Sequence, residues 1–274
     1  YNYFILNDFA ISSTGSLTIE PGITINMRGD NALNFYNYGL LNADGVSFKG
    51  ISADNSLLKL YGTSTIQNSS LDNVKIVSYD DNLTVTSTLF NNITFPSPVN
   101  LYLQQPAIQP VISDITFGSN VSYPGISIEN PGVPSSGLKT TFILENLGYN
   151  YFILNDFAIS STGSLTMEPG LTVNMRGSTA LNFYNYGLLN ANGVSFRGIS
   201  LSTSIIDCRG TEVINNCKFE KTQLKILNSA SFKVENSRFK DIITAIDINN
   251  PASCLIRNNE FLSNDYGIKN SGTV

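Results

Sequence analysis

The side chains that most often carry hydrolytic chemistry are scarce here, and the 274 residues include no histidine. Without an imidazole, neither a Ser-His-Asp nor a Cys-His arrangement can form. Glycoside hydrolysis instead needs two carboxyl groups on opposite sides of the scissile bond. The only tandem acids are Asp80 and Asp81, in the segment SYDDN between two strand-like runs. We interpret them as a solvated turn.

The other charged residues form no recognisable catalytic or metal-binding pattern. A calcium-dependent lyase needs converging carboxylates and a base, whereas Asp207, Asp241 and Asp247 are dispersed. The cations that could meet on adjacent coils are Arg209, Arg238, Lys240 and Arg257. We therefore predict no catalytic residue, no metal site and no cofactor.

The three cysteines give little functional information. Cys208, Cys217 and Cys254 lack the spacing of a zinc site. We favour three thiols; the alternative is one disulfide, either Cys208–Cys217 or Cys217–Cys254.

Tyrosine and asparagine recur in a pattern that suits carbohydrate. In the segment LNFYNYG, with Leu33 and Phe35 inward, every second side chain turns outward. The outward residues are Asn34, Tyr36 and Tyr38, and in a second identical segment Asn182, Tyr184 and Tyr186. Phenol rings beside amides suit the apolar faces and hydroxyl groups of sugars, so these are candidate glycan-binding residues. The alternative is that the tyrosines only cap an external aromatic stack, or that Tyr38 lies in a turn.

Composition narrows the function classes further. The chain carries 16 Lys+Arg against 21 Asp+Glu, a net charge of −5, which argues against nucleic-acid binding. No stretch approaches the 18 consecutive apolar residues of a membrane span, and no leader pattern opens the sequence. Because only 14% of the residues are charged, we expect an extracellular or cell-surface protein that meets neutral glycans.

A long internal duplication is the clearest feature of the sequence. Residues 1–52 recur at 149–200 with seven substitutions. The apolar positions that differ exchange only apolar residues, namely Ile19/Met167, Ile23/Leu171 and Ile25/Val173. The two copies are therefore expected in similar environments, but they diverge after residue 52, so the long repeat is not the structural unit.

A shorter repeat lies beneath the duplication. The pattern apolar-x-Asn-x-x-apolar occurs around Asn68, Asn216, Asn236 and Asn258, with looser versions around Ser87 and Asp114. The closing apolar residues, which we expect to point inward, are Phe48, Leu71, Phe90, Phe117, Phe196, Phe219, Phe239 and Phe261. Their mean spacing near 22 residues gives about a dozen units. Short alternating runs rich in β-branched and aromatic residues predict strands, and units this short must stack. The sequence therefore predicts an all-β fold, a parallel β-solenoid with three strands per coil.

The segments GSLTIEPGITINMRGDNALNFYNYGLLNADGVSF and CLIRNNEFLSNDYGIKNSG resemble coils of the right-handed parallel β-helix, or pectin-lyase-like, superfamily. The resemblance covers nearly the whole chain and implies three sheets. It also implies that Asn68, Asn216, Asn236 and Asn258 form a structural ladder of stacked turn amides. Ser87 and Asp114 depart from that ladder. The Asn-Thr-Asp, Gly-His-Gly and Arg-Ile-Lys segments of galacturonase-like relatives are all missing.

Proline marks a different kind of segment in the middle of the chain. Seven of the ten prolines fall within residues 96–137, which predicts loop-rich coils. We expect one continuous β-helix over 1–274, and two abutting solenoids as the alternative. Because both ends resemble ordinary coils without a cap, we expect a fragment of a larger protein, with neighbouring domains as possible partners.

Two functional classes remain on this basis. The first is a non-catalytic surface module or adhesin whose partner is a polysaccharide or cell-surface glycan. The second is a structural stalk or spacer of the kind found in surface layers. A polysaccharide lyase or glycoside hydrolase ranks third.

Overall fold

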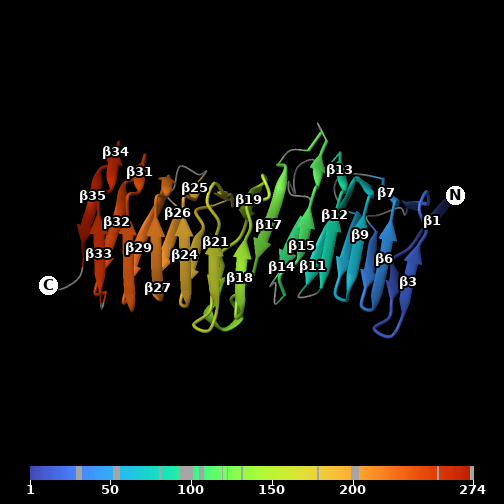
Figure 1. Ribbon diagram of the computed structural model, residues 1–274, viewed down its shortest axis with the longest axis horizontal. Coiled ribbons are helices and arrows are strands. Elements are labelled where there is room, and N and C mark those ends of the chain that lie inside the picture. The colour runs from blue at the N-terminus through green and yellow to red at the C-terminus, as the bar shows by residue number, and fades with distance from the viewer. Residues whose placement is uncertain are drawn as a thin grey trace. The chain divides into compact units, whose positions relative to one another are not determined.

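A computed structural model shows an all-β chain, with 60% of the residues in strands that stack as a parallel solenoid of about 10 turns. It describes the chain except residues 29–32, 52–55, 80–81, 93–100, 105–107, 119, 122, 131, 178, 199–203, 252 and 272–274. The chain divides into two compact units, Tyr1–Ser127 and Ile128–Val274. Figure 1 shows the strands of each unit as successive rungs.

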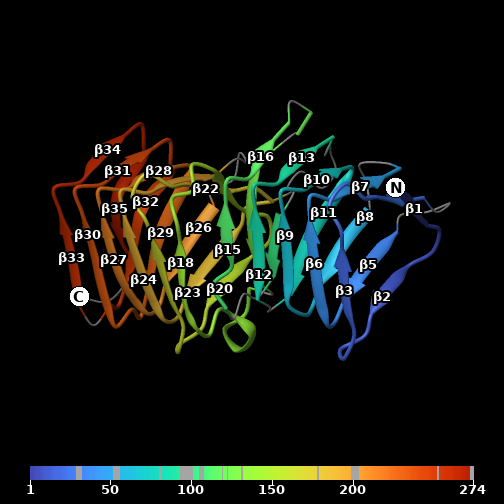
Figure 2. The same ribbon diagram turned by 45° about the vertical axis from the view of Figure 1, so that its right-hand side comes forward.

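Unit 1 contains three parallel sheets, and each turn adds one strand to every sheet. Sheet 1 consists of β1 (Asn2–Ile5), β4 (Thr24–Met27), β7 (Ser47–Gly50), β10 (Ser70–Asp72), β13 (Leu89–Asn91) and β16 (Thr116–Phe117). Sheet 2 includes β2 (Phe9–Ile11), β5 (Asn34–Asn37), β8 (Ser56–Leu60), β11 (Val74–Tyr79) and β14 (Leu101–Gln104). Sheet 3 consists of β3 (Ser16–Ile19), β6 (Leu40–Asp44), β9 (Ser64–Gln67), β12 (Leu83–Thr86) and β15 (Val111–Ser113). Figure 2 shows the strands of sheet 3 following one another.

Unit 2 repeats this arrangement of three strands per turn. Its sheets are numbered within the unit by their place in the coil, so the same number in the two units does not denote one continuous sheet. Sheet 1 includes β19 (Asn150–Ile153), β22 (Thr172–Met175), β25 (Ser195–Gly198), β28 (Lys218–Glu220), β31 (Arg238–Lys240) and β34 (Glu260–Leu262). Sheet 2 consists of β20 (Phe157–Ile159), β23 (Asn182–Asn185), β26 (Ser204–Cys208), β29 (Thr222–Leu227), β32 (Thr244–Asn249) and β35 (Tyr266–Asn270). Sheet 3 consists of β18 (Thr141–Leu144), β21 (Ser164–Met167), β24 (Leu188–Asn192), β27 (Thr211–Asn215), β30 (Ser231–Glu235) and β33 (Cys254–Arg257). Strand β17 (Gly125–Glu129) spans the boundary between the units in the sequence, and a 3₁₀ turn, η1, covers Pro134–Ser136.

Aromatic rows fill the interior, as the spacing of the closing residues predicts. In unit 2, Phe196, Phe219 and Phe239 are fully buried register partners, and their ring centroids are 5.1 and 4.7 Å apart. Phe48, Leu71 and Phe90 form the corresponding buried row in unit 1. The last members, Phe117 and Phe261, are only half-buried. The inward orientation of this row is therefore confirmed.

The predicted parallel β-solenoid is confirmed, and its turns, about 10, are close to the dozen expected. The expected number rested on a mean spacing near 22 residues in the Asn-containing repeats. Turns such as those from Phe9 to its partner Phe35, and from Ile76 to Leu101, are longer than that mean. In both of these turns the longest connection in the sequence joins a strand of sheet 1 to a strand of sheet 2.

Single residues in the left-handed region make the sharp turns between sheets. After the strands of sheet 3 these are Gly45, Asn68, Ser87 and Asp114 in unit 1 and Gly193, Asn216, Asn236 and Asn258 in unit 2, with φ between 47° and 66°. Asparagine and aspartate tolerate this conformation better than other residues with a side chain. The four asparagines of the repeat pattern therefore occupy the same turn position in their coils.

Candidate functional site

The segment NFYNYG places two tyrosines on the outer face of sheet 2. In β5, Phe35 and Asn37 are buried, so Tyr36 turns outward and Tyr38 follows at the end of the strand. Gly39 then lets the backbone of adjacent turns meet, because a Cβ there would lie 2.2 Å from the carbonyl oxygen of Gly15. Gly62 meets Gly39 in the same way one turn later. These glycines therefore bring the residues before them, Tyr38 and Tyr61, into adjacent positions.

A buried amide holds this turn in place. Asn37 Nδ2 donates to Ser64 Oγ at 2.9 Å and to the carbonyl oxygen of Thr63 at 3.1 Å. Its Oδ1 accepts a hydrogen bond from the Gly39 amide at 3.0 Å. All its principal hydrogen-bonding groups are paired, so the amide orders the turn at little cost. Sequence reasoning considered only the outward residues of this segment and missed Asn37.

The tyrosines of three successive turns stack on one another. The ring centroids of Tyr38 and Tyr61 are 4.9 Å apart with an interplanar angle of 15°, and those of Tyr61 and Tyr79 are 4.3 Å apart with an angle of 5°. Together with Tyr36 we call these residues the tyrosine row. The sequence analysis missed Tyr61 and Tyr79, although the Tyr-Gly dipeptide recurs at residues 61 and 62.

The two sides of the Tyr36 and Tyr38 rings differ. These rings are nearly parallel, with centroids 6.1 Å apart. On one side, Lys59 Nζ lies 5.2 Å from the Tyr36 centroid, and Tyr61 covers Tyr38. On the other side the preceding turn supplies Ala10, the register partner of Tyr36, and then Ser12. These side chains are exposed and too small to cover a phenol ring.

The hydroxyl group of Tyr61 remains protonated at neutral pH. Partial burial and a hydrogen bond with Tyr79 raise the pKa of Tyr61 to about 12. A neutral phenol can both donate and accept a hydrogen bond. Tyr38 is 46% exposed, while Tyr36, Tyr61 and Tyr79 are half-buried.

The candidate amides Asn34 and Asn182 have partners within their own units. Asn34 donates from its backbone to Asp8 Oδ1 at 2.8 Å and from Nδ2 to Asp8 Oδ2 at 3.2 Å. Asn182 makes the same pair of bonds to Asp156, at 2.7 and 3.4 Å. Their donors therefore connect the first residue of β5 and of β23 to an aspartate of the preceding turn, which leaves mainly their carbonyl oxygens for a ligand.

The second copy surrounds its tyrosines with charge. Tyr184 and Tyr186 lie with centroids 6.3 Å apart, and the Arg209 guanidinium lies 6.0 and 5.4 Å from them. Asp207, almost fully buried, accepts hydrogen bonds from Arg209 Nε and Nη2 at 3.0 and 2.8 Å. Burial, followed by nearby Asp156 and Asp207, raises the pKa of Tyr184. The pair Lys59 and Tyr61 in unit 1 is thus replaced by Asp207 and Arg209 in unit 2.

A buried carboxyl group replaces Ser64 beneath the second copy. Glu212 Oε1 accepts from Asn185 Nδ2 at 2.5 Å and from the Gly210 amide at 3.1 Å, and Oε2 accepts from Ser229 Oγ at 2.7 Å. Burial raises the pKa of Glu212 although these three hydrogen bonds oppose the shift. This carboxyl group is fully buried. Its hydrogen bonds therefore order the turn, and its oxygens do not face a substrate.

The asparagines predicted as a ladder make bonds between coils, chiefly to neighbouring side chains. Asn258 Nδ2 donates to Asn236 Oδ1 at 3.4 Å, which joins two residues of the set directly. Asn236 donates to Asn215 Oδ1 at 2.9 Å, and Asn216 donates to Asn192 Oδ1 at 3.3 Å. Asn68 instead donates to Asp44 Oδ1 at 2.7 Å. These amides therefore connect each turn with the turn before it.

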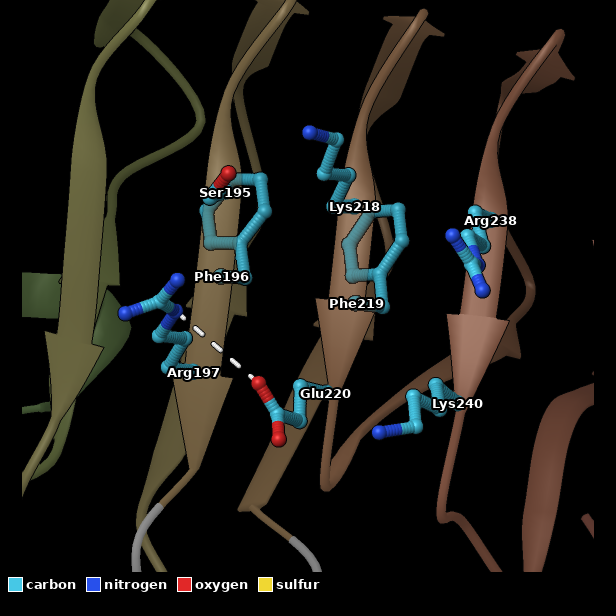
Figure 3. A pocket seen from close by; sticks show the side chains of 8 residues that line it. All are labelled: Ser195, Phe196, Arg197, Lys218, Phe219, Glu220, Arg238 and Lys240. Atoms are coloured by element: carbon cyan, nitrogen blue, oxygen red, sulfur yellow. Dashed lines mark ion pairs between the residues drawn. The ribbon is translucent and has the colours of Figure 1, made fainter. Parts of the chain in front are cut away.

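The basic residues singled out in the sequence lie in different places. Arg238 and Lys240 lie on β31 beside a shallow hollow, where Figure 3 shows them with the Arg197–Glu220 ion pair. Arg257 pairs with Glu235, and Arg209 belongs to the tyrosine cluster of unit 2. Sequence inspection did not connect Arg197 and Lys218 with this hollow.

The described residues contain no group of three or more His, Cys, Asp or Glu side chains placed to hold a metal ion. Asp80 and Asp81 lie outside the described residues. Cys208 and Cys217 are buried free thiols, and Cys254 is an exposed one. In the part of the chain that the structure describes, no helix is long and apolar enough to cross a membrane.

Comparison of the chain with known protein families, with curated proteins and with solved structures yields no match.

Proposed function

We propose that this protein is a non-catalytic, extracellular or cell-surface module of the pectin-lyase-like superfamily that binds polysaccharide as an adhesin. The observation that carries the proposal is the tyrosine row of unit 1, in which four rings line the outer face of sheet 2 with neighbouring centroids 4.3 to 6.1 Å apart. The proposed partner is a neutral glycan chain or fibre.

The chemistry of the row suits a sugar in two ways. The ring faces of Tyr36 and Tyr38 on the side of Ala10 and Ser12 are backed only by small side chains, so the C–H face of a pyranose can pack there. The neutral phenol groups supply donors and acceptors for its hydroxyl groups. Because the solenoid holds the rings at fixed positions, little side-chain entropy remains to be lost on binding.

The second candidate is a structural stalk or spacer, and one observation favours it. The rings of Tyr38, Tyr61 and Tyr79 stack on each other, so most of their apolar faces are already covered without a ligand. Under this function the row only protects the sheet, and removing an outer ring changes stability but not binding.

A depletion assay against a panel of insoluble neutral polysaccharides separates the two functions. We expect the wild type to bind at least one glycan, and Tyr36→Ala to weaken that binding. Tyr184→Ala tests the second copy, and the double variant tests whether the copies contribute together. Unchanged binding in the double variant contradicts a role for these tyrosines.

Matched controls connect a loss of binding to the row itself. Tyr266 is 60% exposed on β35 of unit 2 and is not a member of the row, and Tyr266→Ala removes an equal side chain. We expect it to bind as the wild type does. A turnover assay on the same panel examines the enzyme alternative, and product release there contradicts the non-catalytic proposal.

A further inference from the structure

Unit 2 carries a cluster of positive charge on the outer face of sheet 1. The outward residues of β25, β28 and β31 form two rows across the strands. One row runs Ser195, Lys218, Arg238, and the other runs Arg197, Glu220, Lys240. Four of these six positions are cationic, in a chain whose net charge is −5.

These residues surround a hollow of about 200 Å³ between the strands. Figure 3 shows Lys218 and Arg238 on neighbouring strands, with Arg197 and Lys240 on either side of Glu220. Register partners on neighbouring strands are about 4.8 Å apart. Several cations can therefore approach one small anionic group at the same time.

The acidic partners already present hold these cations only weakly. Arg197 Nε lies 3.9 Å from Glu220, Arg238 Nε lies 3.4 Å from Glu260, and Lys240 Nζ lies 3.3 Å from Asp241, with all six side chains at least 37% exposed. Exposed ion pairs of this kind contribute about 0–1 kcal/mol. Within the described residues, Lys218 makes no ion pair. An incoming anion can therefore replace the acidic side chains at little cost.

The first copy shows that the coil itself does not demand this charge. At the matching positions of unit 1 the pairs are Ser47 with Lys49, Ser70 with Asp72, and Leu89 with Asn91. That face has one cation and one anion where the hollow has four cations and one anion. The positive charge is therefore a property of unit 2, because the strand arrangement is the same in both units.

We infer that this hollow binds an acidic residue of a polysaccharide through its carboxylate or sulfate group. Its volume of about 200 Å³ lies below the roughly 300–1,000 Å³ of a pocket that encloses a free small ligand, which suits one residue of a longer chain. A nucleic acid requires a broad basic surface, whereas this cluster covers three strands of an acidic protein. The inference concerns residues of unit 2, whereas the tyrosine row lies in unit 1, and it does not depend on that row.

The test compares charged and neutral forms of the same polymers. Binding to polygalacturonate and to its methyl ester isolates the carboxylate, and binding to dextran sulfate and to dextran isolates the sulfate. We expect the wild type to bind at least one polyanion at low salt more tightly than its neutral form, and to release the polyanion as salt rises. Failure to bind either polyanion, or equal binding to the neutral form, overturns the inference.

Variants then assign the binding to the hollow. We expect the double variant Lys218→Gln/Arg238→Gln to weaken polyanion binding by about tenfold or more. Lys269→Gln on β35 removes a charge from another sheet and should stay within about twofold of the wild type, as expected for screened distant charges. Glu220→Gln removes the competing carboxylate of Arg197, and we expect it to tighten binding.

If Lys218→Gln/Arg238→Gln and Lys269→Gln lose polyanion binding equally, the assignment of binding to the hollow is contradicted. Weaker polyanion binding by Glu220→Gln contradicts it as well. The tyrosine variants distinguish this inference from the proposed function. They should leave polyanion binding intact, while the hollow variants should leave binding to neutral glycan intact.

Discussion

The buried carboxyl group of Glu212 offers a sharp test of how unit 2 is held together. In Glu212→Ala, Asn185 keeps its bond to the carbonyl oxygen of Thr211 at 3.2 Å, and Ser229 keeps its bond to that of Gly210 at 2.9 Å. The Gly210 amide, however, loses its acceptor. An unsatisfied buried donor costs about 1–3 kcal/mol, and the vacated volume adds to this. We expect a loss of about 2–4 kcal/mol in the free energy of unfolding.

The amide variant Glu212→Gln should behave differently. Its carbonyl oxygen can still accept from Asn185 and Gly210, and its NH₂ group can donate to Ser229 Oγ. It also removes the burial penalty that raises the pKa of Glu212. We therefore expect Glu212→Gln to stay within about 1 kcal/mol of the wild type at pH 7.

The contribution of Glu212 to the free energy of unfolding should change with pH in a defined direction. Because burial raises the pKa of Glu212, the folded state binds this proton more tightly than the unfolded state, whose value is about 4.3. This proton favours folding at low pH, and that advantage is lost as pH rises through the pKa of the folded state. The stability of the wild type relative to Glu212→Gln should fall over that range.

Urea unfolding followed by circular dichroism at several pH values measures these differences. If Glu212→Gln is as unstable as Glu212→Ala at pH 7, the ionised carboxylate must be essential and the reasoning is refuted. A stability difference between wild type and Glu212→Gln that does not change with pH refutes the raised pKa.

Three further predictions concern the core, the turns and the thiols. Phe239 is fully buried between Phe219 and Phe261, so Phe239→Ala should cost about 3–5 kcal/mol in a urea melt, and a silent change contradicts the aromatic row. Gly62→Ala places a methyl group 2.2 Å from a backbone oxygen and should cost about 1–3 kcal/mol in the same assay; an unchanged midpoint contradicts the close approach. A thiol reagent at pH 8 should label only the exposed Cys254 in the folded protein, because the other two thiols are buried and burial raises their pKa values. Mass spectrometry that finds three labels at once contradicts this burial.

The coil architecture was predictable because its signals are local. The alternation in a run such as Ser231–Glu235 predicts which side chains face the core. Asn236 indicates the turn that follows, because asparagine tolerates a positive φ. The length of each coil was less predictable, because the connections between sheets 1 and 2 differ in their number of residues.

The candidate sites were predictable only in part, because they depend on register between coils. The alternation rule identified Tyr36 on β5 and Tyr38 just after its end. It could not show that Tyr61 and Tyr79 stack on them, since the intervening turns differ in length and sequence. The same limit applies to the hollow, where Arg197 and Lys218 come together only through the pairing of β25 with β28.

The binding isotherm of Tyr38 variants on an insoluble neutral glycan tests the central claim most directly. Tyr38 is the most exposed ring of the row, and stacking on an aromatic ring contributes about 1 kcal/mol, or a factor of about five in affinity. We predict that Tyr38→Ala weakens binding by at least that factor, that Tyr38→Phe keeps most of it, and that Tyr266→Ala has no effect. Binding by Tyr38→Ala that equals that of Tyr266→Ala would contradict the account and favour a purely structural row.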